Sequence, residues 1–150
     1  MGLNGAGKTT TIKVCLGLTF PDEGSVRIFG ERISDATFKK VGYAPEKPGF
    51  PAFLTGLEVM YYAARLLDLS LPESRFQEVL EKVDLWDDRG KLVCNYSKGM
   101  QQRLAIAVAM LHDPELYILD EPSSGLDPLG RRLIKEILKE LRKSGHTVFF

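Results

Sequence analysis

A glycine-rich octapeptide, Gly2 to Thr9, limits how this chain can fold more than any other stretch. It reads G-L-N-G-A-G-K-T and fits the pattern G-x-x-x-x-G-K-[ST]. Glycines let the backbone bend so that successive N–H groups point at a phosphate. The N-terminus of the helix expected after them favours an anion. The alternative is a glycine-rich turn without a ligand.

The pattern assigns individual roles within this loop. Lys8 would reach the β- and γ-phosphates of a nucleotide, and the Thr9 hydroxyl would join Mg²⁺. The residues expected to bind the nucleotide are Asn4, Gly5, Ala6, Gly7, Lys8, Thr9 and Thr10.

Strands and helices are expected to alternate along the chain. Helical periodicity covers residues 8–18, 55–85, 98–111 and 129–141, and short apolar strands are expected at 25–29, 41–44, 116–119 and 146–150. Alternation of this kind predicts an α/β sheet. The long helical stretch interrupts it and predicts a helical subdomain, at about residues 52–112, attached to the sheet core.

Two acids, Asp120 and Glu121, directly follow the apolar run Leu116 to Leu119. Such a run is typical of a strand buried on both faces, and ligands of α/β folds bind at the carboxyl ends of strands. Asp120 can therefore hold a Mg²⁺ ion, and Glu121 can polarise a water for attack on a γ-phosphate. The alternative is a solvated acidic turn after the strand.

Composition narrows the choice of partners. Lys plus Arg is 20 and Asp plus Glu is 20, so bulk charge does not favour nucleic acid. No apolar run approaches the ~20 residues of a membrane-spanning helix, so any membrane link is expected to run through a partner. Cys15 and Cys94 lack a metal-binding pattern and are expected to be small buried apolar groups; the alternative is a disulfide or metal role.

Three further stretches resemble motifs of the ABC (ATP-binding cassette) ATPases, in the order found in that family. Residues 96–103, Y-S-K-G-M-Q-Q-R, resemble the signature L-S-G-G-Q-x-Q-R. Residues 120–127 resemble the end of Walker B running into the D-loop, and residues 41–46 resemble the Q-loop region. The resemblance covers essentially the whole chain and implies a P-loop NTPase fold of the ABC ATPase type.

The resemblance also implies an activity and further site residues. The parent protein is expected to hydrolyse ATP with Mg²⁺, using Glu121, Lys8 and Glu46 for catalysis and Thr9, Asp120 and Glu46 around the metal. Ser97, Gly99 and Asp127 are expected to contact the nucleotide held by a second domain in a head-to-tail dimer. From the residues alone, Ser97 could instead simply cap a helix.

Two departures from the family pattern favour its exporter-type branch. Glu46 stands where most members carry Gln, and Lys98 and Met100 replace Gly and Gln in the signature. The resemblance thus implies a subunit on the cytoplasmic face of the cell membrane that powers transport, with a lean to export, through a transmembrane permease.

Other classes of function stay open to different degrees. A soluble ABC ATPase acting on ribosomes or DNA shares these motifs, whereas a GTPase or kinase would leave the signature unexplained. The adenine-stacking aromatic and the switch histidine of the family would lie outside this sequence, and His146 does not match the latter. The 150-residue piece alone is therefore expected to be weakly active or inactive.

Overall fold

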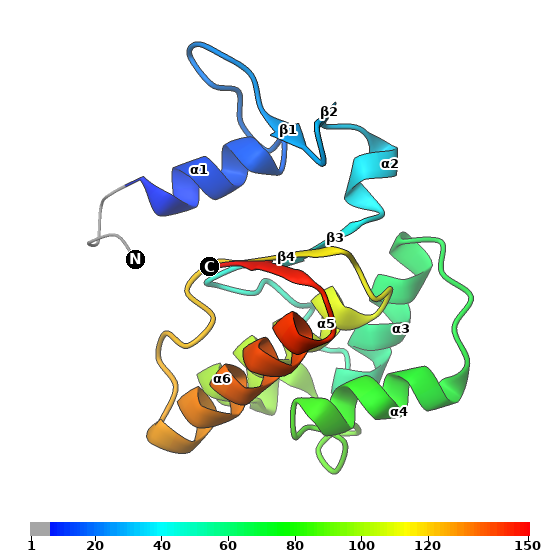
Figure 1. The fold of residues 1–150 in the computed structure, drawn as a ribbon. Helices are drawn as coiled ribbons and strands as arrows, with labels where there is room; N and C mark the ends of the chain where they lie inside the picture. The colour runs from blue at the N-terminus through cyan, green and yellow to red at the C-terminus, as the bar shows by residue number, and fades with distance from the viewer. Residues whose placement is uncertain (1–6) are drawn as a thin grey trace.

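Strands β3 (Val41–Ala44), β4 (Leu116–Leu119) and β5 (Thr147–Phe149) form a parallel sheet, in the order β3-β4-β5, in the computed structural model, which describes residues 7–150 (Figure 1). The register sets Ala44 opposite Leu119. The strands expected at 41–44 and 116–119 are confirmed at those bounds, and the final strand is slightly shorter than expected. Helices cover both faces of the sheet, which confirms the α/β class.

Alternate residues of β4 point to opposite faces and pack into two separate cores. Ile118 joins Val41, Ile12 of helix α1 (Lys8–Cys15) and Leu16, the residue that follows this helix. Its neighbours Tyr117 and Leu119 join the larger core on the other face. Since both faces are covered, the strand consists of apolar residues without polar alternation.

Four longer helices lie on the face of the larger core (Figure 1). They are α3 (Gly56–Leu66), α4 (Glu73–Lys82), α5 (Lys98–Met110) and α6 (Pro128–Lys143), with a 3₁₀ turn at Val93–Asn95 before α5. Helix α5 is the central one, because Leu104, Ala105, Ile106 and Ala107 bury all of its sides in turn. No helix within residues 7–150 is both long enough and apolar enough to cross a bilayer.

Local sequence explains where these helices begin. The Thr55 hydroxyl accepts the Glu58 N–H and the Glu58 carboxylate accepts the Thr55 N–H, which is a capping box at the start of α3. Pro72 directly precedes α4. The helical subdomain expected at about 52–112 remains a prediction; its helices share one continuous core with β3 and β4.

The segment between α1 and β3 differs most from expectation. The strand expected at 25–29 is only β1 (Arg27–Ile28), and it pairs antiparallel with an unexpected strand, β2 (Glu31–Arg32). Phe29 and Gly30 both have positive φ, at 56° and 78°, so they form the two-residue hairpin turn that ends β1 early. A short helix, α2 (Asp35–Phe38), was also not expected from the pattern.

Helix α1 ends at Cys15 and not at residue 18. Gly17 has a φ of 65° and the N–H of Leu18 bonds to the carbonyl of Lys13 at 2.9 Å. This is a left-handed helix end of the kind that glycine favours, and it returns the chain toward the hairpin.

Candidate nucleotide-binding site

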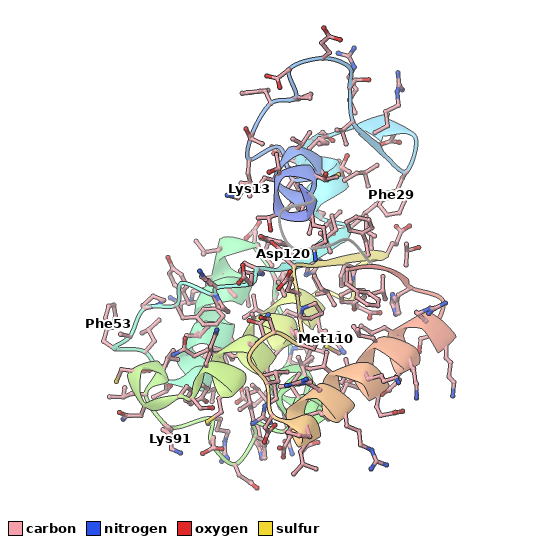
Figure 2. All side chains as sticks on the ribbon, turned by 90° about the vertical axis from the view of Figure 1, so that its left-hand side faces the viewer. Lys13, Phe29, Phe53, Lys91, Met110 and Asp120 are labelled. Carbon is pink, nitrogen blue, oxygen red and sulfur yellow. The ribbon has the colours of Figure 1, made fainter. Side chains whose placement is uncertain are left out.

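The carboxyl ends of β3 and β4 lie side by side and bring two loops together. The backbone N–H of Asp120 donates to the carbonyl of Ala44 at 2.9 Å, so pairing continues one residue beyond the strands. Glu46 therefore leaves β3 beside the Asp120–Glu121 turn. In Figure 2, Asp120 lies between α1 and the helices on the other side of the sheet.

Asp120 is a buried carboxylate, with an exposed fraction of 3 %. It lies two residues after Ile118 and so follows the face of the sheet that α1 covers. Within residues 7–150 no side chain or backbone group donates a hydrogen bond to this carboxylate. Burial raises the pKa of the neighbouring Tyr43 phenol, and the negative charge of Asp120 raises it further.

These oxygen groups fit a Mg²⁺ ion. A buried carboxylate needs a compensating positive charge, and Mg²⁺ is usually held by one or two carboxylates together with phosphate oxygens and waters. Asp120 could supply such a carboxylate, and Thr9, exposed in the first turn of α1, could supply a hydroxyl. No group of three His, Cys, Asp or Glu side chains able to hold a metal occurs in the described part of the chain. A Mg²⁺ ion here would need the oxygens of a bound nucleotide.

Lys8 and Glu121 come together across this edge of the sheet. The Lys8 ammonium lies 3.2 Å from the Glu121 carboxylate, and both side chains have an exposed fraction of 36 %. Glu121 has a φ of 47°, which is uncommon for a residue with a side chain. An ion pair this exposed contributes little to stability.

The described part of the phosphate loop begins at Gly7, directly before α1. The Thr11 hydroxyl and N–H both donate to the Gly7 carbonyl, at 2.9 and 2.8 Å, and hold the loop to the first turn. Thr9 and Thr10 are exposed on that turn. Asn4, Gly5 and Ala6 lie outside the described residues.

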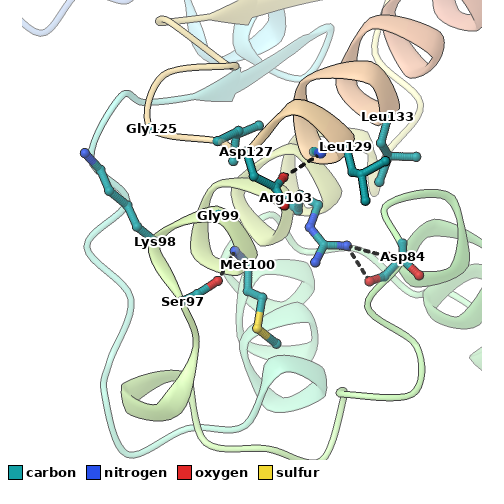
Figure 3. A pocket seen from close by; sticks show the side chains of 12 residues that line it. Asp84, Ser97, Lys98, Gly99, Met100, Arg103, Gly125, Asp127, Leu129 and Leu133 are labelled. Carbon is teal, nitrogen blue, oxygen red and sulfur yellow. Dashed lines mark hydrogen bonds and ion pairs between the residues drawn. The ribbon is translucent and has the colours of Figure 1, made fainter.

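A second group of expected residues lines a separate pocket of about 780 Å³. Ser97 and Gly99 at the start of α5 face Asp127 at the start of α6 (Figure 3). The Ser97 hydroxyl accepts the Met100 N–H at 3.2 Å, so Ser97 does cap α5, and it remains exposed at the pocket. Asp127 likewise caps α6, accepting the Gly130 N–H at 2.7 Å. We call this the signature pocket.

The signature pocket and the Lys8 site do not overlap. Neither Lys8, Asp120 nor Glu121 lines the pocket. The chain runs from one to the other through residues 121–127.

Comparison with known proteins identifies the family of the chain. Residues 1–124 match the family model described as ABC transporter. The chain belongs to the ABC transporter family of ATP-binding proteins.

Two relatives of this ABC domain are named for the transport of bacitracin. The bacitracin transport ATP-binding protein BcrA of Enterococcus faecalis is 44 % identical over 153 residues, which cover 99 % of this chain and 49 % of the relative. BcrA of Bacillus licheniformis is 42 % identical over 153 residues, covering all of this chain and 50 % of the relative. The chain thus spans about half the length of these relatives.

Solved structures show the same ABC fold. An ATP-binding subunit of an ABC transporter superposes with a TM-score of 0.84 at 35 % identity, covering 99 % of this chain and 64 % of that one. The protein cbiO1 of Clostridium perfringens, part of the ABC transporter complex cbiONQ, has a TM-score of 0.78 at 26 % identity and is covered to 63 %. The P-loop ABC ATPase fold expected from the motifs is confirmed.

Sequence reasoning missed two polar side chains in the second turn of α5. The Gln102 amide donates to the Pro45 carbonyl at 3.1 Å, and Arg103 donates to the Val83 carbonyl at 2.8 Å. Arg103 also donates to the Asp84 carboxylate at 2.9 Å (Figure 3). The available signal was a glutamine and an arginine directly before an apolar helical run, but their partners lie 19 to 57 positions away in the sequence.

Proposed function

We propose that the full-length protein hydrolyses ATP and powers transport, with a lean to export, through a transmembrane partner. One observation carries the chemistry: the Lys8 ammonium and the Glu121 carboxylate meet at the edge of the sheet where Asp120 is buried. The names of the BcrA relatives support a link to transport.

Glu121 is the general base in this proposal. A bound triphosphate competes with Glu121 for the Lys8 ammonium, because phosphate oxygens carry more negative charge than one carboxylate. Once released, Glu121 accepts a proton from the water that attacks the γ-phosphorus, and the bond from that phosphorus to the leaving ADP oxygen breaks.

The remaining residues bind and orient. Asn4, Gly5, Ala6, Gly7, Thr9 and Thr10 surround the phosphates, and Thr9, Asp120 and Glu46 would hold Mg²⁺. The ion, when bound, neutralises charge on the phosphate oxygens. Glu46 can reach this point because β3 ends beside β4.

The signature pocket completes the site from a second copy. Ser97 and Gly99 present a hydroxyl, a bare backbone and a helix N-terminus, which together favour an anion. We infer a head-to-tail dimer in which these groups and Asp127 of one copy close over the nucleotide of the other. Such a dimer would attach to its permease at the cytoplasmic face of the membrane; nucleic acid is not an expected partner.

Replacing Glu121 by Gln tests the proposal. Gln keeps the shape of the side chain but cannot accept the proton, so we expect ATP turnover by the full-length protein to fall by roughly 10²-fold or more. Phosphate release under saturating Mg·ATP is the measurement. Affinity for ATP should be retained, which fluorescence titration with a labelled nucleotide would establish.

Glu115→Gln is the matched control. Glu115 lies just before β4, at the opposite end of the strand, where it is 60 % exposed and pairs with Lys40. This variant should turn over ATP like the natural protein. Unchanged turnover in Glu121→Gln would show that the base is wrongly assigned, and failure of the natural protein to bind Mg·ATP would refute the function itself.

A further inference from the structure

Gln102 is a polar side chain in the most apolar part of the molecule. Its exposed fraction is 3 %, and it lies on α5 just before the buried run that begins at Leu104. Its amide reaches the carbonyl of Pro45, 57 positions away in sequence, at 3.1 Å. An apolar residue of similar size would avoid the cost of burying an amide, so this contact has a role beyond filling space.

The acceptor belongs to the loop that presents Glu46. The carbonyl of Ala44 accepts the N–H of Asp120, and the next carbonyl, that of Pro45, accepts the amide of Gln102. These two successive carbonyls thus bond to the strand that leads to Asp120 and to helix α5, which Ser97 caps. Glu46 is the first residue beyond these two contacts.

The helix that carries Gln102 is itself held firmly. Near its end, the carbonyl of Ala109 packs against the backbone of Gly42 in β3, and near its start Arg103 bonds to the end of α4 through Val83 and Asp84. The backbone of Gln102 is therefore held in place while its side chain bonds to the loop that presents Glu46.

We propose that Gln102 is a positioning residue that holds Glu46 beside Asp120 and links its position to the signature helix α5. This inference rests on the proposed function, because it assigns Glu46 a task at the Mg·ATP site. Gln102 does not touch the reacting groups; it acts through the Pro45 carbonyl. A movement of the Ser97 end of α5 would therefore shift Glu46 through the hydrogen bond between Gln102 and the Pro45 carbonyl.

The test replaces Gln102 by Met in the full-length protein. Met is similar in size but cannot donate, so the Pro45 carbonyl loses its donor. We expect kcat, counted per nucleotide-binding site, to fall roughly tenfold while KM for ATP changes by less than about twofold. Counting per binding site removes any unfolded fraction from the comparison.

Gln101→Met is the matched control. Gln101 is the adjacent residue, occupies the variable position of the signature and does not line the signature pocket. Its side-chain amide donates to the Tyr96 carbonyl at 3.4 Å. Its kcat should match that of the natural protein. An equal loss in both variants would mark a general effect on the helix and would overturn the inference.

A double-mutant cycle separates positioning from simple packing. In a Glu46→Ala background the side chain that Gln102 positions is absent, so Gln102→Met should lower kcat by less than about twofold further. A tenfold loss in both backgrounds, or no loss in the natural one, would overturn the inference while leaving the proposed function intact. A natural protein that does not hydrolyse ATP would overturn both.

Discussion

Gly42 of β3 packs its backbone directly against the carbonyl oxygen of Ala109 on α5. A Cβ at this position would collide with that oxygen and would lie 2.8 Å from the Pro114 ring. The absence of a side chain thus lets the central helix approach the sheet, and it sets the depth at which α5 lies beneath the strand that leads to Glu46.

Gly42→Ala should therefore destabilise the protein. Backbone atoms cannot move aside as a flexible side chain would, so we expect a loss of about 2–3 kcal/mol, at the upper end of the range for overpacked cores. Urea denaturation of the full-length protein measures it. Gly49→Ala is the control, because a Cβ there meets nothing within 4 Å, and equal stabilities of the two variants would contradict the packing argument.

Replacing Ser97 by Asp separates its two roles. Asp is as good a helix cap as Ser, so the free energy of unfolding should stay within about 0.5 kcal/mol of the natural value. A negative charge at the signature pocket should nevertheless repel the phosphates of a nucleotide held by the second copy. We expect dimerisation induced by a non-hydrolysable ATP analogue to be lost in sedimentation experiments.

Ser97→Ala provides the contrast to that variant. It removes the cap without adding charge, so stability should fall by about 1 kcal/mol while nucleotide-induced association is weakened less. If Ser97→Asp associates as readily as the natural protein, the signature pocket does not face a phosphate.

Asp120→Asn should separate stability from activity. The substitution removes a buried charge that lacks a hydrogen-bond donor within residues 7–150, so without Mg²⁺ the protein should be as stable as before or more stable, by about 1 kcal/mol. Turnover of Mg·ATP should fall by roughly 10²-fold, because the carboxylate ligand is lost. Denaturation in EDTA and a phosphate-release assay measure the two effects, and a strong destabilisation would show that the charge has an unrecognised partner.

His112 should make stability depend on pH. Burial lowers the pKa of its imidazole below the ordinary value of 6.5, against the smaller opposing effect of its bond to the Val41 carbonyl. As the pH falls below 6.5, His112 becomes protonated in the unfolded chain but stays neutral in the folded one. The free energy of unfolding therefore decreases until the pH passes the lower pKa of the folded state.

The His112→Gln variant isolates this effect. Gln can still donate to the Val41 carbonyl but does not titrate. The stability of the natural protein relative to the variant should be constant above about pH 7 and should decline as the pH is lowered toward 5. Urea denaturation across this range tests it, and parallel curves for the two proteins would contradict it.

The elements with strong local signals could be predicted, and those fixed by distant contacts could not. The strands at Val41–Ala44 and Leu116–Leu119 are continuous apolar runs bounded by polar or proline residues, so their bounds were predicted correctly. The hairpin at Phe29–Gly30 was missed because Phe29 adopts a positive φ that its residue type does not suggest.

The sequence likewise predicted the residues of the site but not the contacts between them. Its motifs identify Lys8, Asp120 and Glu121, but the ion pair between Lys8 and Glu121 depends on how α1 lies over the sheet. The bond from Gln102 to Pro45 joins two segments that no local pattern relates. The roles of Glu46, Ser97, Gly99 and Asp127 in nucleotide binding remain predictions.

The alternation of faces along β4 has a consequence for how this strand can change over evolution. Ile118 and Asp120 share the face toward α1, whereas Tyr117 and Leu119 serve the opposite core. Inserting or deleting one residue within the strand would turn the Asp120 carboxylate toward the larger apolar core. It would also turn the residues that now face the larger core toward the smaller core beside α1. We therefore expect β4 to tolerate substitutions between apolar residues but not the insertion or deletion of a single residue.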